Sequence, residues 1–206
     1  MSNVMPNFYV MKSAESDNQE LSRYYEVDWL PELPLFDYNV ETPNRQMFSG
    51  VYDVVVKKKE LDVDVALDNY LVASPFLSLC DNFAVDYISV GVDVVLLEGK
   101  PVDKEFSLFF LKARVSILDD KQSIYTLVDE SLLLPVAERL STDPVYEKIE
   151  SFVVKDGVSE DLFFCSEIKE TVCSEKFKLE FQKQGLKGIK FIAIDAEFLY
   201  SPWDEF

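Results

Sequence analysis

Short runs of β-branched and aromatic residues recur along most of this sequence. Such residues favour β-strands because their side chains pack well on a pleated surface. We expect strands at residues 8–11, 50–56, 70–73, 87–97, 105–118, 123–128, 149–154 and 161–164. Signals for helices are few by comparison. The sequence therefore predicts an α+β fold with mixed, mostly antiparallel sheets and a few short helices.

Two segments combine a short strand, a serine and a helix in the same order. We expect Ser74 to cap a helix whose first residue is Pro75, a position that proline tolerates well. Ser174 should cap a second helix, which should end at Gly185 because glycine readily adopts the left-handed conformation that follows a helix. A second strand should follow that helix, at the end of the segment 170–191.

In the second helix, Phe177 and Phe181 lie four residues apart and therefore share one face. We expect this face to pack inward. The polar residues that should meet water, or the boundary of the packed face, are Glu175, Lys176, Gln182 and Lys183.

The longest predicted strand, at residues 105–118, alternates in a way that assigns its two faces. One face carries Phe109, Leu111 and Val115, and we expect it to be core. The other face changes along its length from apolar residues such as Phe110 to polar ones such as Lys112.

The length and composition allow a substantial core. The chain has 206 residues, of which 48% are hydrophobic, and six glycines. No proline-rich or serine-rich tract marks a linker between domains. We therefore expect residues 1–206 to form a single compact domain, with an aromatic and acidic strap in residues 1–45.

The charge balance is strongly acidic. Asp and Glu number 38 against 20 Lys and Arg, for a formal net charge of −18. A field of this sign repels nucleic-acid phosphates and anionic membranes, and it speeds encounters with basic proteins. We expect a basic protein partner, and no direct binding to nucleic acid or to a membrane. A surface charged for solubility is the alternative interpretation.

Histidine is absent, which removes mechanisms that pair it with a serine or cysteine nucleophile or use it as a metal ligand. The sequence also lacks a glycine-rich phosphate loop and a CxxC pair. The run LDVDVALD comes nearest to a metal-binding loop, but an EF-hand counted from Asp62 would have Leu67 and Ala73 where glycine and glutamate are needed. We expect no catalytic residue, metal or cofactor.

Two pairs of aspartates can be placed from local pattern. Strand alternation in residues 61–67 would put Asp62 and Asp64 on a solvated face. Asp119 and Asp120 should form a turn between two strands, because paired aspartates favour turns.

Three cysteines, Cys80, Cys165 and Cys173, are unevenly spaced among apolar neighbours. This pattern favours buried free thiols in a reducing compartment. The amino end lacks a basic region followed by a continuous apolar run, and no window approaches the length of a transmembrane helix. The sequence therefore predicts a cytoplasmic protein.

The segment TVCSEKFKLEFQKQGLKGIKF resembles the carboxy-terminal signature of the Imm11 (DUF1629) family of bacterial immunity proteins. In that signature, a strand ending in V-x-S-E-x-[FL] leads into a helix and then into a G-[LI]-[KT]-G-[IL]-[KR]-F segment. The second part matches at Gly185, Leu186, Gly188, Ile189 and Phe191.

Two shorter matches extend this resemblance over residues 50–198. The run YLVASPFLSL resembles an earlier strand-serine-helix unit of the family, although Pro75 replaces the usual acidic residue. The run ILDDKQSIY resembles a mid-chain L-D-x-x-x-S segment, with Leu118, Asp119 and Ser123 at the matching places.

The resemblance implies a protein of interbacterial competition that binds and neutralises a cognate secreted toxin, including those of the Rhs and type VI classes. It implies no enzymatic activity. An acidic inhibitor suits this role because toxin domains directed at nucleic acids are commonly basic. Two other classes stay open: an enzyme that uses paired carboxylates, and a non-catalytic structural or adaptor protein with a basic partner.

Candidate contacts for a partner are acidic residues near turns and strand ends, and aromatic or acidic residues of the flanking segments. They are Asp62, Asp64, Asp68, Asp103, Glu105, Asp119, Asp120, Trp29, Asp37 and Trp203. The alternative for each acidic residue is a solvated charge, and for the segment 24–39 a strap that covers a sheet. Reversing the charges of Asp62, Asp64 and Asp68 together is expected to weaken binding without unfolding the protein.

Overall fold

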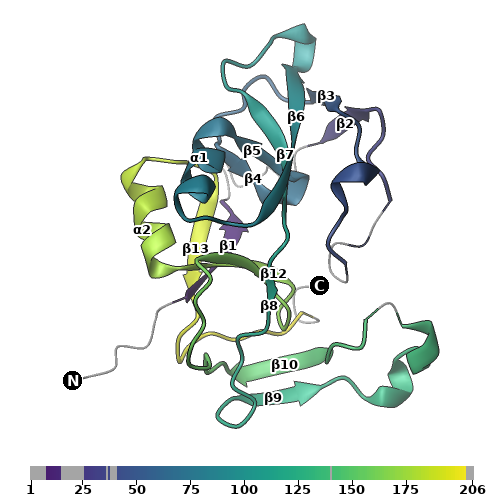
Figure 1. Cartoon of the computed structure of the whole chain (residues 1–206), viewed down its shortest axis with the longest axis vertical. Coiled ribbons are helices and arrows are strands. Elements are labelled where there is room, and N and C mark those ends of the chain that lie inside the picture. The colour runs from purple at the N-terminus through teal and green to yellow at the C-terminus, as the bar shows by residue number, and fades with distance from the viewer. Residues whose placement is uncertain (1–7, 15–25, 36, 38–40, 140, 203–206) are drawn as a thin grey trace.

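The computed structural model describes residues 8–14, 26–35, 37, 41–139 and 141–202. In these residues, two α-helices and thirteen β-strands in mixed sheets form an α+β fold, as the sequence predicts. Two larger sheets hold eleven of the strands, and the other two form a separate hairpin at the lower end of the molecule in Figure 1.

One sheet has six strands, with β6 (Tyr87–Leu96) and β7 (Phe106–Leu111) at its centre. In the order β2-β3-β6-β7-β5-β4, the outer strands are β2 (Val27–Leu30), β3 (Val51–Val56), β5 (Leu71–Ala73) and β4 (Val65–Ala66). The pair β3–β6 is parallel and the others are antiparallel. Strand β7 is buried on both faces, because Leu108 and Phe110 pack into one cluster and Phe109 and Leu111 into another.

The second sheet has five strands, in the order β13-β1-β12-β11-β8. They are β13 (Ile189–Ala193), β1 (Phe8–Ser13), β12 (Glu170–Ser174), β11 (Leu162–Cys165) and β8 (Arg114–Val115). The pair β11–β8 is parallel and the others are antiparallel. The hairpin consists of β9 (Ile124–Leu127) and β10 (Tyr146–Ser151), which are antiparallel. Mostly antiparallel pairing is therefore confirmed.

A core between the two larger sheets joins them. Phe109 of β7 enters it from the first sheet, and Met11 and Cys173 enter it from the second. Helices α1 (Ser74–Asn82) and α2 (Glu175–Lys183) cover one side of this core, where they lie next to each other in Figure 1. Phe76 of α1 and Phe177 of α2 meet edge to face, with ring centroids 6.0 Å apart. Segments from both ends of the chain thus complete one core.

Each of the two strand-serine-helix units has the same kind of hydrogen-bonded junction between its serine and an acidic residue. Ser174 donates its N–H to the carbonyl oxygen of Asp161 at 2.9 Å and its hydroxyl to the Asp161 carboxylate. Ser74 donates its N–H to the carbonyl of Glu105 at 3.0 Å and its hydroxyl to Glu105 Oε2 at 3.3 Å. In each unit, the acidic residue directly precedes the strand that pairs with the strand of the serine. The similarity of the two sequence segments therefore corresponds to a shared geometry.

The prediction that Ser74 caps its helix is wrong. Helix α1 already includes Ser74, with Ala73 before it, and no side-chain capping bond forms. The hydroxyl of Ser74 is turned instead toward Glu105. Pro75 is accordingly the second helical residue, a position whose N–H has no partner inside the helix in any case.

Helix α2 follows the prediction closely. Ser174 Oγ accepts the N–H of Phe177 at 3.2 Å, and Gly185 follows the helix with a φ of +70°. The N–H groups of Gly185 and of the next residue close the two backbone hydrogen bonds of a Schellman motif. Phe177 and Phe181 are buried, the four polar residues expected on the outer faces are exposed, and β13 follows.

The prediction of one continuous strand at residues 105–118 is wrong. The chain leaves the first sheet after Leu111 and enters the second at Arg114, so β7 and β8 belong to different sheets. At the break, the N–H of Lys112 donates to the Asp86 carbonyl at 2.9 Å and its ammonium pairs with the Asp86 carboxylate at 2.7 Å. The change from apolar to polar residues therefore marks a crossing between sheets.

Three further segments differ from the sequence-based expectation. Strand β10 begins and ends three residues before the predicted strand 149–154. Residues 61–64 are irregular, so strand alternation, which requires extended and paired backbone, does not apply to them. Residues 27–30, expected within a strap, form the edge strand β2.

The loop between α2 and β13 packs closely against the β4 edge of the first sheet. The carbonyl of Lys187 accepts the N–H groups of Asp64 at 2.9 Å and Val65 at 3.1 Å. Gly188 has a φ of +109°, and a Cβ at this position would lie 2.1 Å from the Val65 carbonyl oxygen. Glycine is therefore required here by both conformation and space.

All three cysteines are buried free thiols, as predicted. Burial raises the pKa of each thiol, so each stays protonated and weakly nucleophilic near neutral pH. The helices in the described part of the chain are too short to cross a lipid bilayer.

Replacing Phe177 with alanine should lower the free energy of unfolding by about 3–5 kcal/mol, because the ring is fully buried between α1 and the sheets. Urea denaturation followed by circular dichroism measures the change. Leu179→Ala is the matched control, since Leu179 lies on the same helix but is 57% exposed, and it should cost less than about 1 kcal/mol. Equal losses in the two variants would contradict the assigned helix faces.

Stability should also fall at high pH because of Tyr87. Its hydroxyl donates to Asp81 Oδ1 at 2.7 Å, and burial, together with this hydrogen bond, raises the pKa of Tyr87 to about 12. Tyrosine in the unfolded chain has a pKa of about 10. Protonated Tyr87 therefore contributes fully to stability below that pH, and this contribution is lost as the pH rises toward the pKa in the folded state. The urea midpoint should therefore drop less between about pH 9 and about pH 11 in Tyr87→Phe than in the wild type. Equal drops would exclude Tyr87 as a source of the pH dependence.

Candidate partner-binding surface

Asp64 is only 6% exposed, so the prediction that it lies on a solvated face is wrong. Its Oδ1 pairs with Lys104 Nζ at 2.9 Å, and its Oδ2 accepts the N–H of Lys187 at 2.8 Å. The carboxylate therefore joins the approach to β4, the segment before β7 and the loop after α2. This aspartate stabilises the fold and is not available to a partner.

The other two aspartates of this run are exposed, but their surroundings differ. Asp62 pairs with Lys187 Nζ at 2.9 Å, and the hydrogen bond from Lys187 holds the pKa of Asp62 below its ordinary value. Asp68 lies on a short 3-10 turn, Leu67–Asn69, with its side chain exposed. The expected effect of reversing all three charges is therefore corrected: reversal at Asp64 should destabilise the protein.

Asp103 and Glu105 are both exposed, on either side of Lys104. Glu105 also accepts the hydroxyl of Ser74, so it has a structural role at the start of α1. Since Lys104 and Lys187 lie among these acids, this end of the first sheet carries mixed charge.

Asp119 and Asp120 lie in a turn, as predicted. Asp119 Oδ1 accepts two backbone N–H groups of the following residues, at 2.9 and 3.1 Å, while Asp120 is exposed. The hydrogen bond from the side chain of Gln122 is the main cause that lowers the pKa of Asp119. The N–H of Asp119 donates to the Val153 carbonyl at 2.8 Å, and Ser123 Oγ accepts the Val153 N–H at 3.0 Å. Asp119 and Ser123 thus fix this turn against the chain after β10.

The predicted contacts in the flanking segments have three different outcomes. Trp29 is half-buried on β2 and meets Tyr52 edge to face, with ring centroids 6.0 Å apart. Its contacts with the first sheet favour the covering interpretation of this region. Asp37 is exposed after β2, and Trp203 lies outside the described residues.

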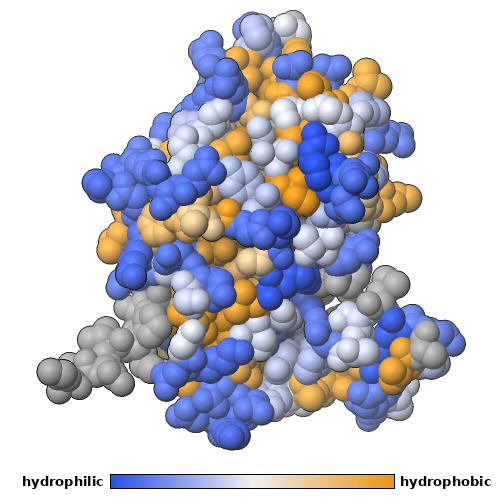
Figure 2. Space-filling model, in the orientation of Figure 1, coloured by the Kyte–Doolittle hydropathy of each residue, from blue (hydrophilic) through white to orange (hydrophobic). Residues whose placement is uncertain are grey.

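Sequence reasoning missed one prominent surface, which we call the arm and define as the described residues 119–139 and 141–151. It contains the β9–β10 hairpin and the connection between its strands, and it projects from the lower part of the molecule in Figure 1. We call residues 129–139 the tip. Three large apolar side chains of the tip are exposed: Leu132 by 79%, Leu134 by 61% and Val136 by 63%. In Figure 2, apolar atoms stand among hydrophilic ones in this region at the lower right.

The arm is acidic as well as apolar. It contains eight acidic and three basic residues. Arg139 pairs with Glu130 at 2.6 Å and Lys148 with Glu150 at 2.8 Å, so two of the three basic groups are already neutralised within the arm. A surface that combines exposed apolar residues with excess acidic charge suits a partner that has both apolar and basic groups.

The base of the arm is fixed to the body of the protein. Ile149 is fully buried and exchanges two backbone hydrogen bonds with Tyr200, at 2.9 and 3.1 Å. Tyr125 and Tyr146 meet edge to face across the hairpin, with ring centroids 5.2 Å apart. Packing at the base therefore sets the direction in which the tip projects.

A buried carboxylate that sequence reasoning also missed, Glu167, supports the approach to the arm. It accepts the hydroxyl of Ser116 at 2.6 Å and the N–H groups of Ile117 and Leu118, each at 3.3 Å. The thiol of Cys165 donates to it at 3.1 Å. These donors replace the water that a buried carboxylate loses, so Glu167 is a structural residue.

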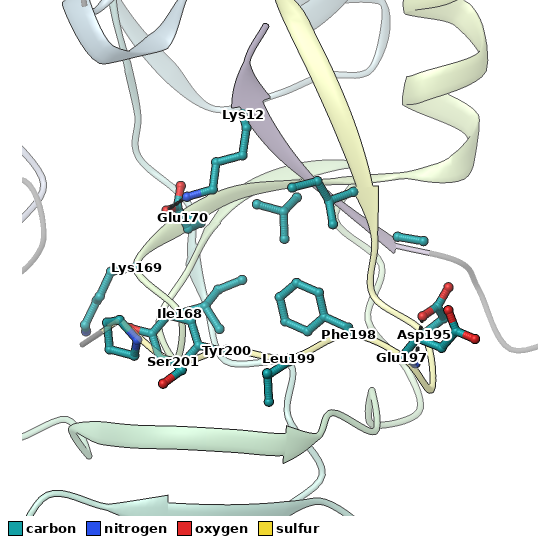
Figure 3. A pocket seen from close by; sticks show the side chains of 14 residues that line it. Lys12, Ile168, Lys169, Glu170, Asp195, Glu197, Phe198, Leu199, Tyr200 and Ser201 are labelled. Carbon is teal, nitrogen blue, oxygen red and sulfur yellow. Dashed lines mark hydrogen bonds and ion pairs between the residues drawn. The ribbon is translucent and has the colours of Figure 1, made fainter. Parts of the chain in front are cut away.

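A pocket of about 680 Å³ lies near the base of the arm and is shown in Figure 3. Lys12 and Glu170 form an ion pair on one side of it, and Asp195 and Glu197 lie on the other side, beyond Phe198. Asp195 accepts the N–H of Glu197 at 2.9 Å and so shapes its own turn. Lys12, Glu170 and Asp195 therefore have partners within the fold. Across the described residues, no cluster of three acidic or cysteine side chains is arranged to hold a metal ion.

Comparison of the sequence with protein-family models and with curated proteins found no match. The similarity to the Imm11 family therefore stays a prediction. The residues that carry this similarity have structural roles here: Gly185 ends α2, Gly188 lies against Val65, and Asp119 and Ser123 fix a turn.

Replacing Asp64 with alanine should lower the free energy of unfolding by about 1–3 kcal/mol, because Lys104 and the Lys187 N–H lose their acceptor. Asp62→Ala is the control, since it removes an exposed ion pair with Lys187, whose N–H group Asp64 accepts, and it should change stability little. Urea denaturation of both variants tests the difference. A destabilisation by Asp62→Ala as large as that by Asp64→Ala would show that the buried carboxylate has no special role.

Proposed function

We propose that this chain is an immunity protein that binds and neutralises a cognate secreted antibacterial toxin, such as an Rhs or type VI effector. The observation that carries the proposal is the arm, which combines exposed apolar residues with an excess of acidic residues. Such a surface is suited to a protein partner. The similarity of residues 50–198 to the Imm11 family supports the same function.

The charge of the whole chain supports a basic toxin domain as the partner. A net charge of −18 attracts a basic protein over distances that contacts do not reach, and it accelerates association at low salt. The same charge opposes binding to nucleic acid. An acidic inhibitor can therefore occupy the phosphate-binding cleft of a toxin without competing for the toxin's substrate itself.

In this proposal, the protein neutralises the toxin by binding to it and catalyses no reaction. The buried carboxylates of Asp64 and Glu167 are engaged in hydrogen bonds inside the protein, and the buried thiols are protonated near neutral pH. These groups stabilise the inhibitor. The protein would act in the cytoplasm of the toxin-producing cell, where its free thiols suit the reducing conditions.

A non-catalytic adaptor with a basic partner is the second candidate. The arm favours it too, since an acidic and apolar projection can join two proteins as well as inhibit one. The two candidates differ in their effect on growth. An immunity protein is needed for the growth of a cell that makes the toxin, whereas an adaptor does not protect the cell.

Co-expression with the toxin domain encoded by the neighbouring gene should restore the growth of bacteria that the toxin alone arrests. The two proteins should then co-purify as a stoichiometric complex, and the association rate should fall as the salt concentration rises from about 0.05 M to about 0.5 M, because the attraction between the net charges is screened. Stopped-flow fluorescence measures the rate.

The outcomes separate the candidates. Growth arrest despite abundant folded protein and active toxin would contradict the immunity function for that pair. A stable complex with a basic protein that is not toxic would favour the adaptor. Phe177→Ala, which should lose much of its stability, is a control for the need for folded protein.

A further inference from the structure

We propose that the tip of the arm is the primary docking surface for the basic partner, and that it inserts Leu132, Leu134 and Val136 into an apolar depression of that partner. This inference rests on the proposed function and adds to it the surface and the mode of contact. It moves the binding site away from the acidic residues near Asp62.

Three apolar side chains of the tip are exposed. Leu132, Leu134 and Val136 occur within five consecutive residues, and each is more than half exposed. Single exposed apolar residues are common on protein surfaces, whereas larger exposed apolar areas mark interaction sites. Covering all three would remove a large apolar area from water and supply much of the binding free energy.

Hydrogen bonds within the tip hold it in shape. Arg139 Nε donates to the Leu134 carbonyl at 2.6 Å, and Arg139 Nη2 donates to Glu130 Oε2 at 2.6 Å. Asp129 Oδ1 accepts the N–H of Ser131 at 2.8 Å. These hydrogen bonds connect residues of the tip with one another and fix its conformation. Because the conformation is set before binding, less conformational entropy is lost in the complex.

The charge of the tip indicates the chemistry of the partner. The acidic residues of the tip are Asp129, Glu130 and Glu138, and its one basic residue, Arg139, is paired with Glu130. A basic surface is attracted by this excess of acidic residues. A second copy of this chain would bring two such acidic tips together within a pair that already carries twice the net charge, which opposes self-association. The observations therefore favour a basic partner over a homodimer.

The decisive variant combines Leu132→Ser, Leu134→Ser and Val136→Ser. It should keep the urea midpoint of the wild type, since these side chains are exposed, and it should weaken binding to the purified toxin domain by about 100-fold or more. Isothermal titration calorimetry measures the affinity, and growth rescue reports the loss of protection. The matched control combines Leu30→Ser, Leu35→Ser and Leu179→Ser, which removes three apolar residues elsewhere that are also more than half exposed, and it should change the affinity by less than about threefold.

A second variant tests the shape of the tip separately from its apolar content. Arg139→Gln removes the ion pair with Glu130 and the hydrogen bond to the Leu134 carbonyl, and it leaves the three apolar residues in place. It should weaken binding by about tenfold, because the loosened tip loses more entropy on docking. This change should be smaller than that of the triple variant.

The results distinguish this inference from the proposed function. If the wild type binds and protects but the triple variant binds within twofold of it, the docking surface is elsewhere and the immunity function stands. If the folded wild type neither binds nor protects, both proposals fail. Sedimentation equilibrium of the protein alone tests whether a second copy of the chain binds the tip. A dimer that the triple variant abolishes would assign the tip to self-association and overturn the inference.

Discussion

The edge-to-face contact between Phe76 and Phe177 lies where the two halves of the fold meet. Each ring belongs to a helix that follows a strand of a different sheet, so each sheet positions one side of the contact. Packing between the helices completes the core into which both sheets direct side chains. The chain crosses from β7 to β8, which lie in different sheets, so this crossing depends on the two sheets being held side by side. The arm follows β8, and its placement depends on the same packing.

The unit from β12 to β13 could be predicted almost completely, because each of its signals is local. Ser174 caps the helix, Gly185 ends it, and the spacing of Phe177 and Phe181 defines its buried face. The continuous strand expected at residues 105–118 failed because both pieces have strand-forming residues, and the change of sheet depends on partners distant in sequence. The same holds for Ser74, whose hydroxyl is drawn to Glu105.

The candidate site was less predictable than the fold. Charge could be counted from the sequence, but whether a carboxylate meets solvent or a backbone N–H group can depend on segments more than a hundred residues apart, as with Asp64 and the N–H of Lys187. The apolar residues of the tip resemble an ordinary buried run in sequence, and only the structure shows that Leu132 is exposed. Several acids therefore stabilise the protein internally, and the surface best suited to a partner combines acidic charge with apolar contact. That combination allows long-range attraction and short-range affinity to be altered by separate substitutions.

The loop that contains Gly188 has a further consequence for the edge of the first sheet. An edge strand offers unpaired backbone groups to which a strand of another molecule can add, a common route to aggregation. At β4, the Lys187 carbonyl occupies the N–H groups of Asp64 and Val65, and the missing side chain of Gly188 lets the loop lie directly against the strand. This edge is therefore closed to further strand addition. At high protein concentration, that edge therefore offers no template for sheet growth between molecules.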